Sequence, residues 1–210
     1  IRQRNPTNQT TSNILIFKFC VTILNKSKNL DKSLMKTALI TGASSGIGAK
    51  FAKELAARKS NLILVARSQD KLQKLAESLQ KEFQIQVEVL VQDLTAPQAS
   101  QSIFDEVSQK GLTVDLLINN AGFGDYGAFT ERPLQKQVDM IQVNITALVE
   151  LTSLFLPLMQ KRKRGGIINV SSIAAYQPLP YLSVYAATKA FVLSFTESLW
   201  AENKETGVNI

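Results

Sequence analysis

The fold is decided by a glycine-rich stretch, Thr-Gly-Ala-Ser-Ser-Gly-Ile-Gly, at Thr41–Gly48. An apolar run, Thr37–Ile40, precedes it, and a helical pattern follows at Phe51–Ala56. The order strand, glycine turn, helix is typical of a phosphate-binding turn, because glycines let a phosphate group come close to the main chain. The helix start adds unpaired N–H groups and the positive end of its dipole. Since many glycine turns bind nothing, other motifs have to decide between the two interpretations.

Further motifs follow the turn in a fixed order. They are Asn119-Asn120-Ala121-Gly122, the lone Asn144, Ser171-Ser172 and Tyr185-Ala186-Ala187-Thr188-Lys189. The asparagines and serines come directly after apolar runs, where strands of a sheet would end. A plain structural turn does not account for this set, so the sequence favours a binding function for Thr41–Gly48.

Composition excludes several classes of protein. The chain has 210 residues, a single cysteine, Cys20, and no histidine, so disulfides, histidine catalysis and zinc sites are ruled out. Its formal net charge is +7, but residues 1–34 hold six Lys/Arg and one Asp, which leaves +2 for the rest. This balance does not predict nucleic-acid binding. The basic run Lys161–Arg164 precedes two glycines, and we expect it to complement the dipole at a helix end.

Residues 1–34 differ from the remainder. The polar run Asn5–Asn13 is typical of disorder, and the apolar run Ile14–Leu24 is shorter than the roughly 20 residues of a membrane-spanning helix. No small-residue cleavage pattern follows it. We therefore interpret residues 1–34 as a disordered or non-native upstream extension, with a domain from Met35 to Ile210 and a cytoplasmic location.

From Met35 onward, strand-like and helix-like patterns alternate. The expected strands are Lys36–Thr41, Asn61–Ala66, Gln86–Gln92, Val114–Asn119 and Gly166–Ser171, with the start of another at Val208–Ile210. The clearest expected helices are Gln69–Phe83, Val138–Lys161 and Leu182–Asn203. The strands are continuously apolar, as in a sheet covered on both faces. The sequence thus predicts an α/β fold with a doubly wound parallel sheet, Rossmann-like in three layers.

The motifs Thr-Gly-x-x-x-Gly-x-Gly, Asn-Asn-Ala-Gly and Tyr-x-x-x-Lys, with Asn144 and Ser172 at matching places, resemble those of the short-chain dehydrogenases/reductases. The resemblance runs from Met35 to Ile210. It implies a nicotinamide cofactor, hydride transfer to or from a carbonyl/alcohol pair, and a homodimer or homotetramer formed through Val138–Lys161 and Leu182–Asn203. The family's segment after the sixth strand is absent, so we expect a C-terminally truncated domain that turns over poorly by itself.

The resemblance also assigns roles to individual side chains. Tyr185 and Lys189 are four residues apart on one face of a predicted helix, where an ammonium group favours the phenolate form of a nearby phenol. Tyr185 would then be the acid/base, and Ser172, preferred over Ser171 by family spacing, would hold the substrate oxygen. Asn144 would bend its helix and hold a water linked to the lysine.

The cofactor should be NADP(H), because the second strand ends in Ala66-Arg67 instead of an acidic residue. The resemblance places the cofactor against the following residues: Gly42, Ser44, Ser45, Gly46, Ile47, Gly48, Arg67, Asp93, Leu94, Asn120, Ala121, Gly122, Tyr185 and Lys189. Asp93 would bond the adenine amino group, and the Asn119–Gly122 motif would brace the sheet. Loop residues beside the motifs could line a substrate pocket or simply pack: Phe123, Tyr126, Gln177, Pro178 and Tyr181.

Other functions remain open at this point. A relative of this family could bind NADP(H) as a sensor without turnover, although such proteins usually lack the tyrosine or the lysine. Sugar-nucleotide epimerases and dehydratases share the fold, but they tend to carry Gly-x-x-Gly-x-x-Gly. The sequence therefore favours an NADP-dependent ketone or secondary-alcohol oxidoreductase acting on a small molecule, without nucleic-acid, membrane or metal partners.

Overall fold

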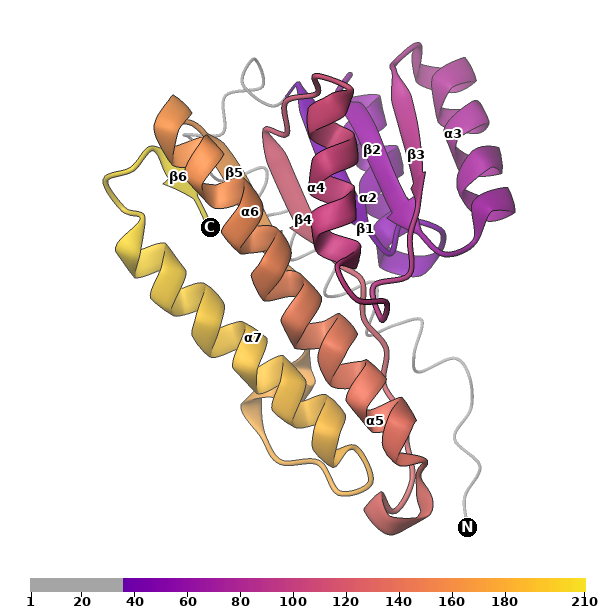
Figure 1. The fold of residues 1–210 in the computed structure, drawn as a ribbon, viewed down its shortest axis with the longest axis vertical. Helices are drawn as coiled ribbons and strands as arrows, with labels where there is room; N and C mark the ends of the chain where they lie inside the picture. Colours follow the sequence, from indigo (N-terminus) through magenta and orange to yellow (C-terminus); the bar gives the residue numbers. More distant parts are fainter. Residues whose placement is uncertain (1–35) are drawn as a thin grey trace.

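The computed structural model describes residues 36–210, so the interpretation of residues 1–34 lies outside the described part. Six parallel strands form one sheet in the order β3-β2-β1-β4-β5-β6 (Figure 1). The strands are β1 (Thr37–Thr41), β2 (Asn61–Ala66), β3 (Val87–Val91), β4 (Leu116–Asn119), β5 (Gly165–Asn169) and β6 (Val208–Asn209). This order confirms the predicted doubly wound parallel sheet.

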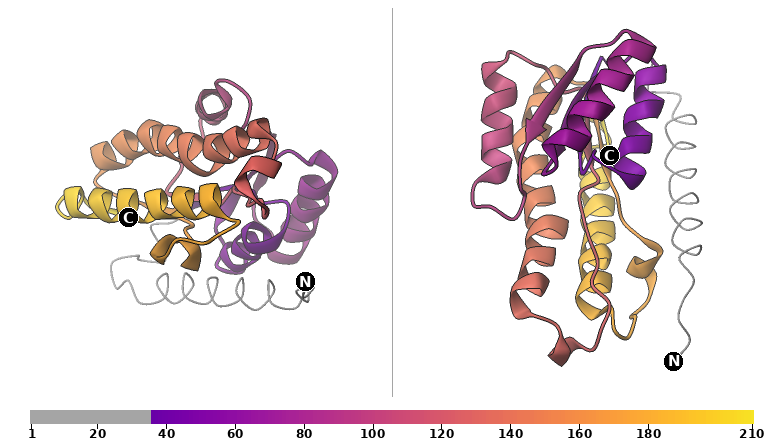
Figure 2. Two further views of the ribbon diagram at one scale, coloured as in Figure 1. Left: turned by 90° about the horizontal axis from the view of Figure 1, so that it is seen from below. Right: turned by 90° about the vertical axis from the view of Figure 1, so that its right-hand side faces the viewer.

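Helices cover both faces of the sheet (Figure 2). They are α2 (Gly46–Ala57), α3 (Gln69–Phe83), α4 (Ala99–Gln109), α5 (Leu134–Ile141), α6 (Ala147–Arg162) and α7 (Ser183–Glu202), with 3₁₀ turns η1 (Phe129–Glu131) and η3 (Ile173–Tyr176). Phe51 of α2 and Leu72 of α3 belong to one buried cluster, and Ile103 of α4 and Phe155 of α6 belong to another. The sheet lies between these two cores, which explains why its central strands are apolar on both sides.

The predicted elements differ from the observed ones mainly at their ends. The strand expected at Val114–Asn119 begins two residues later, at Leu116. Asp115 is buried and uses its carboxylate to accept hydrogen bonds from the main-chain N–H groups of Lys36 and Thr37, at 3.0 and 3.2 Å. The Asp115 side chain thus links the start of β1 to the residue before β4.

The long helix expected at Val138–Lys161 begins earlier, at Leu134, and is interrupted. A π-helical turn, η2 (Gln142–Thr146), separates α5 from α6. The helix ends at Arg162, and Lys163 adopts a left-handed backbone with φ 53°. This confirms that the basic run stands at a helix end. Within the described residues, Leu134–Arg162 is also long and apolar enough to cross a membrane, although core helices share that property and α6 packs against β4, β5 and β6.

The order of the strands reverses between β1 and β4, which are parallel neighbours in the sheet although far apart in sequence. The helices that follow β1 and β4 lie on opposite faces, so a crevice opens at the carboxyl ends of these two strands. Ligands of open α/β sheets bind at such switch points. The glycine turn after β1 and the Asn119–Gly122 motif at the end of β4 both lie there.

Candidate active site

The glycine turn leaves no room for side chains at two positions. A Cβ at Gly42 would lie 2.9 Å from Ala121 Cα, and one at Gly48 would lie 2.3 Å from the Gly42 carbonyl oxygen. At Gly46, by contrast, φ is +56° and nothing lies within 4 Å of a built Cβ. The turn is therefore packed tightly on its protein side and open on the other, as a phosphate cradle requires.

The start of α2 is free to meet an anion. Ser45 is the N-cap residue, and its side chain makes no hydrogen bond to the helix. The first turn contains no acidic residue that would repel a phosphate. Together with the open space at Gly46, this arrangement fits the pyrophosphate of a dinucleotide, with Ser44 and Ser45 as additional donors.

Asn120 and Thr41 join the two strand ends that form the crevice. Thr41 Oγ1 accepts hydrogen bonds from the N–H groups of Asn120 and Ala121, both at 3.0 Å, and donates to the Ile118 carbonyl oxygen at 3.3 Å. Asn120 Nδ2 donates to the Thr41 and Gly42 carbonyl oxygens, at 2.9 and 3.3 Å. These bonds fix the glycine turn relative to β4. Asn120 thus braces the sheet, as the resemblance implied, and Thr41 is a bracing residue that the sequence analysis missed.

The surroundings of Arg67 require one correction. From the sequence, no carboxylate was expected near the end of β2. In the structure, Asp93 of the loop after β3 lies there, with its Oδ2 3.8 Å from Arg67 NH1. Asp93 Oδ1 accepts hydrogen bonds from Thr95 N and Oγ1. The Arg67 side chain is 72% exposed and therefore free to turn toward a ligand. A 2′-phosphate would have to compete with Asp93 for this guanidinium.

Two of the predicted cofactor residues have side chains that pack against the core. The Leu94 side chain is buried in the core beneath α4, so its main chain is the part that can face the crevice. Ile47 is partly buried against the core on the α2 side. Both positions hold the loops in place by packing.

Tyr185 and Lys189 lie together on α7. Lys189 Nζ is 5.9 Å from the centroid of the Tyr185 ring and donates a hydrogen bond to the Val170 carbonyl oxygen at 2.8 Å. Burial lowers the pKa of Lys189 from 10.5 to about 8, because a charged ammonium is poorly solvated there. The group still carries its charge at neutral pH and therefore places a buried cation beside the phenol.

Asn144 occupies the π-helical turn and is 1% exposed. Its Oδ1 accepts from the Phe123 N–H, and its Nδ2 donates to the Phe123 carbonyl oxygen and to Thr188 Oγ1, each at 3.0 Å. Thr188 Oγ1 in turn donates to the Tyr185 carbonyl oxygen at 2.7 Å. Asn144 thus links the loop after β4 to the helix that carries Tyr185. The break in the helix agrees with the predicted bend, whereas the predicted water relay stays a prediction.

The two serines after β5 have different partners. Ser171 Oγ donates to the Lys189 carbonyl oxygen at 2.9 Å and is thereby used to anchor α7. Ser172 Oγ accepts from the Ala174 N–H at 3.2 Å, which leaves its own proton free to donate. Ser172 begins η3, which packs against α7. The hydrogen bonds therefore agree with the choice of Ser172 over Ser171.

The aromatic residues beside the motifs lie mostly at the surface. The rings of Tyr126 and Tyr181 pack against each other with centroids 5.6 Å apart, and both are more than half exposed. A shallow hollow nearby is lined by residues of the loop after β4, of α5 and of the start of α7, including Asp125, Arg132, Tyr181 and Val184, but not by Ser172 or Tyr185. Whether Phe123, Gln177 and Pro178 line a substrate pocket stays a prediction.

Comparison with known proteins agrees with this geometry. Residues 36–210 match the family model described as short chain dehydrogenase. The very-long-chain 3-oxoacyl-CoA reductase-A of Danio rerio is 36% identical over 196 residues, covering 91% of this chain and 61% of that protein. Relatives from Bos taurus and Anas platyrhynchos, named very-long-chain 3-oxoacyl-CoA reductase, are covered over 55% and 56% of their lengths. The chain thus spans less than two thirds of these relatives.

Solved structures of the same kind superimpose well. A bulky-bulky ketone specific alcohol dehydrogenase from Comamonas testosteroni gives a TM-score of 0.79 at 34% identity, with 83% of this chain and 70% of that chain covered. A short-chain dehydrogenase from Sphingobium yanoikuyae in complex with NADPH gives 0.78 at 37% identity, with 82% and 67% covered. The chain belongs to the short-chain dehydrogenase family.

Proposed function

We propose that this chain forms the cofactor-binding and proton-transfer part of an NADP-dependent oxidoreductase that interconverts a ketone and a secondary alcohol. The observation that carries the proposal is the buried Lys189 ammonium beside Tyr185, at the sheet edge where the glycine turn opens. Burying a cation is costly, and packing alone does not require a charged group at this position. Its position is explained if it acts on the phenol.

The side chains divide the work of the reaction between them. When bound, the nicotinamide cofactor would supply the hydride for reduction of the ketone and accept it in oxidation of the alcohol. Ser172, whose hydroxyl proton is free, donates a hydrogen bond to the carbonyl oxygen of the substrate and orients it. In the reductive direction, the Tyr185 hydroxyl gives its proton to that oxygen as negative charge develops there, and the charge of Lys189 stabilises the phenolate that remains. In the oxidative direction, the phenolate takes the proton of the alcohol.

The preference for NADP rests on Arg67 at the crevice, with Ser44 and Ser45 as additional hydroxyl donors. Arg67 is exposed and lies where a 2′-phosphate would be expected, and a guanidinium pairs with phosphate through two parallel hydrogen bonds. Neighbouring structures that contain NADPH support the same cofactor. Asp93 weakens this preference by the extent to which it holds Arg67.

The substrate class that we propose is a ketone of considerable size. The names of similar proteins include a very-long-chain 3-oxoacyl-CoA reductase and a bulky-bulky ketone specific dehydrogenase. We further propose a homodimer or homotetramer through α6 and α7, because Leu158, Phe191 and Trp200 on these helices are 40% to 53% exposed. Phe191 stacks on Phe195 and extends this apolar surface. A cytoplasmic location stays a prediction.

Replacing Tyr185 with Phe tests the proposal. We expect Tyr185→Phe in the full-length protein to bind NADPH like the wild type and to lose turnover by about 10²- to 10⁴-fold, the usual contribution of positioned proton transfer. The matched control is Tyr176→Phe, because Tyr176 is 76% exposed on η3. Equal turnover of Tyr185→Phe and Tyr176→Phe would contradict the assignment. A wild type that binds NADPH without reducing any ketone would favour the sensor function.

A further inference from the structure

The loop after β4 passes directly over the proposed catalytic tyrosine. A Cβ built at Gly124 would lie 3.1 to 3.4 Å from three atoms of the Tyr185 ring, and one at Gly122 would lie 3.4 Å from Lys189 Nζ. The backbone of residues 122–124 is therefore in contact distance of both groups. Any movement of this segment would change the space around the phenol.

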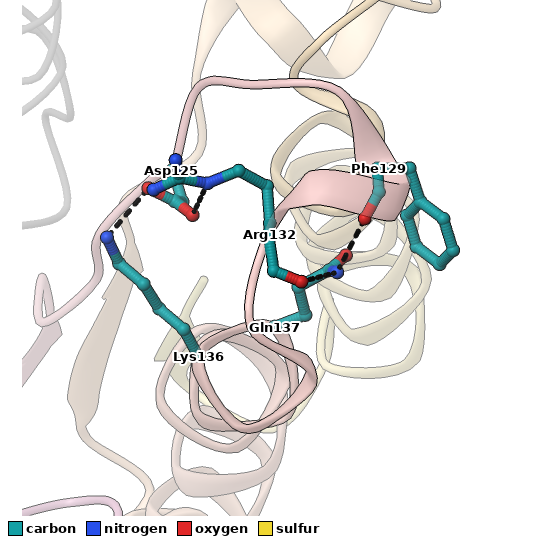
Figure 3. A network of polar contacts seen from close by, with 5 residues as sticks. All are labelled: Asp125, Phe129, Arg132, Lys136 and Gln137. Carbon is teal, nitrogen blue, oxygen red and sulfur yellow. Dashed lines mark hydrogen bonds and ion pairs between the residues drawn. The ribbon is translucent and has the colours of Figure 1, made fainter.

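The next residue, Asp125, is held by two cations (Figure 3). Its carboxylate accepts from Arg132 Nε at 2.6 Å and NH2 at 2.7 Å, and from Lys136 Nζ at 2.7 Å. The Asp125 side chain is 8% exposed, whereas Arg132 and Lys136 are 32% and 46% exposed. The carboxylate thus sits at the centre of the cluster with solvent outside the cations, an arrangement that holds it firmly.

The neighbouring contacts fix the rest of the segment. Gly127 N–H donates to the Tyr181 carbonyl oxygen at 2.9 Å, and a Cβ at Gly127 would lie 2.5 Å from Arg132 Cδ. On the other side, Gln137 Nε2 donates to the carbonyl oxygens of Phe129 and Arg132, at 3.3 and 3.5 Å (Figure 3). The main chain at Arg132 is therefore bonded to the start of α5.

Asn144 holds the same loop through two hydrogen bonds to the main chain of Phe123. The segment 122–127 is thus attached at Asn144, at the Arg132 and Lys136 pair and at Tyr181, and Gly124 lies between these attachments against the Tyr185 ring. We propose that Asp125 is a positioning residue that, through Arg132 and Lys136, keeps this segment seated over Tyr185 and Lys189. The proposal rests on the proton-transfer role proposed above.

The charge of Asp125 persists over the whole working range. Hydrogen bonds from Arg132, and then from Lys136, lower the pKa of the Asp125 carboxyl to about 2. The carboxylate remains ionised in any ordinary assay buffer, so the seating of the loop does not titrate. Asp125→Asn removes the charge while keeping the shape, and it leaves Arg132 and Lys136 facing each other without an anion.

The test compares three variants of the full-length protein. Asp125→Asn should lower kcat by about tenfold or more, because small displacements of a reacting group cost one to two orders of magnitude. Its Kd for NADPH should stay within about twofold of the wild type, because the contacts of Asp125 lie outside the glycine turn. Asp125→Glu should restore most of kcat, since Arg132 and Lys136 are long enough to adjust. Glu88→Gln, which removes the surface pair with Lys110, is the matched control.

Hydrogen exchange supplies a readout that does not depend on activity. The amides of Phe123 and Gly127 should exchange faster in Asp125→Asn, whereas the Ala43 amide, bonded to the Val65 carbonyl oxygen at 3.2 Å, should not change. Unchanged kcat and exchange in Asp125→Asn would overturn the proposal, and so would an equal loss in Glu88→Gln or a parallel loss of NADPH binding. If the wild type reduces no ketone, the proposed function fails, while the exchange rates still decide whether Asp125 seats the loop.

Discussion

Lys189 makes the stability of this chain depend on pH in a defined direction. Its pKa is 10.5 in an unfolded chain and about 8 in the folded chain, a difference that corresponds to about 3 kcal/mol. Between these values the unfolded chain binds more protons, so the free energy of unfolding rises with pH. The cost of burying the ammonium is fully present below about pH 8 and disappears as pH approaches 10.5.

Replacing the lysine isolates this contribution. Lys189→Met should remove it, together with the hydrogen bond that the lysine donates to the Val170 carbonyl oxygen both as ammonium and as neutral amine. The free energy of unfolding is measured in urea, without cofactor, for the wild type and for Lys189→Met. We predict that the wild-type value minus the variant value increases by about 2 to 3 kcal/mol from pH 7 to pH 10. Subtracting the variant cancels the titration of the other lysines. The control is Lys204→Met, because Lys204 is exposed over Trp200. A difference that stays flat from pH 7 to pH 10 would refute the reasoning.

Two further predictions concern the cofactor crevice. Arg67→Ala should weaken NADPH binding by about tenfold and leave NADH binding unchanged, whereas Asp93→Asn should strengthen NADPH binding by releasing Arg67. Titration of each protein with both cofactors measures this, and equal affinities of the wild type for NADPH and NADH would count against it. Gly48→Ala should lower the free energy of unfolding by about 3 kcal/mol, the upper part of the usual range for overpacking, because its Cβ would meet the Gly42 carbonyl oxygen at 2.3 Å. Gly46→Ala, where space is open, should cost only the roughly 1 kcal/mol of a left-handed backbone, so similar melting temperatures for the two variants would contradict the packing argument.

The layers of the fold were predicted well from the sequence, because the pattern of apolar residues within each element indicates its type. Asn61–Ala66 and Gln69–Phe83 have the predicted bounds. In the strand every central residue is buried, and its short length and β-branched residues favour a strand over a helix. In the helix the apolar residues return on one face, which gives a clear helical period. The predicted ends of strands were less accurate where a side chain takes the place of main-chain hydrogen bonds between strands. Asp115 is the example, since its carboxylate bonds the start of β1 before β4 begins.

Contacts between distant segments were the part that sequence alone did not supply. The pairing of Asp93 with Arg67 depends on the register of β2 against β3, which places Val91 beside Ala66 and the two loops side by side. The same is true of Thr41, which accepts hydrogen bonds from residues about 80 positions away. Nothing in the sequence around Thr41 indicates that its hydroxyl accepts hydrogen bonds from a distant loop, since threonine hydroxyls commonly bond to nearby main chain.

The break in the long helix shows why the site and the fold were predicted unequally. An asparagine in an apolar helix signals a local conflict, because it buries polar atoms that the helix ladder does not satisfy. The sequence therefore marked Asn144 as special, but its partners follow only from the fold. The π-helical turn aims the amide at Phe123 and Thr188, and both lie on segments that contact Tyr185 or its helix. One buried amide thus links the bend between α5 and α6 to the loop after β4, the same segment in which Asp125 is bonded to Arg132 and Lys136.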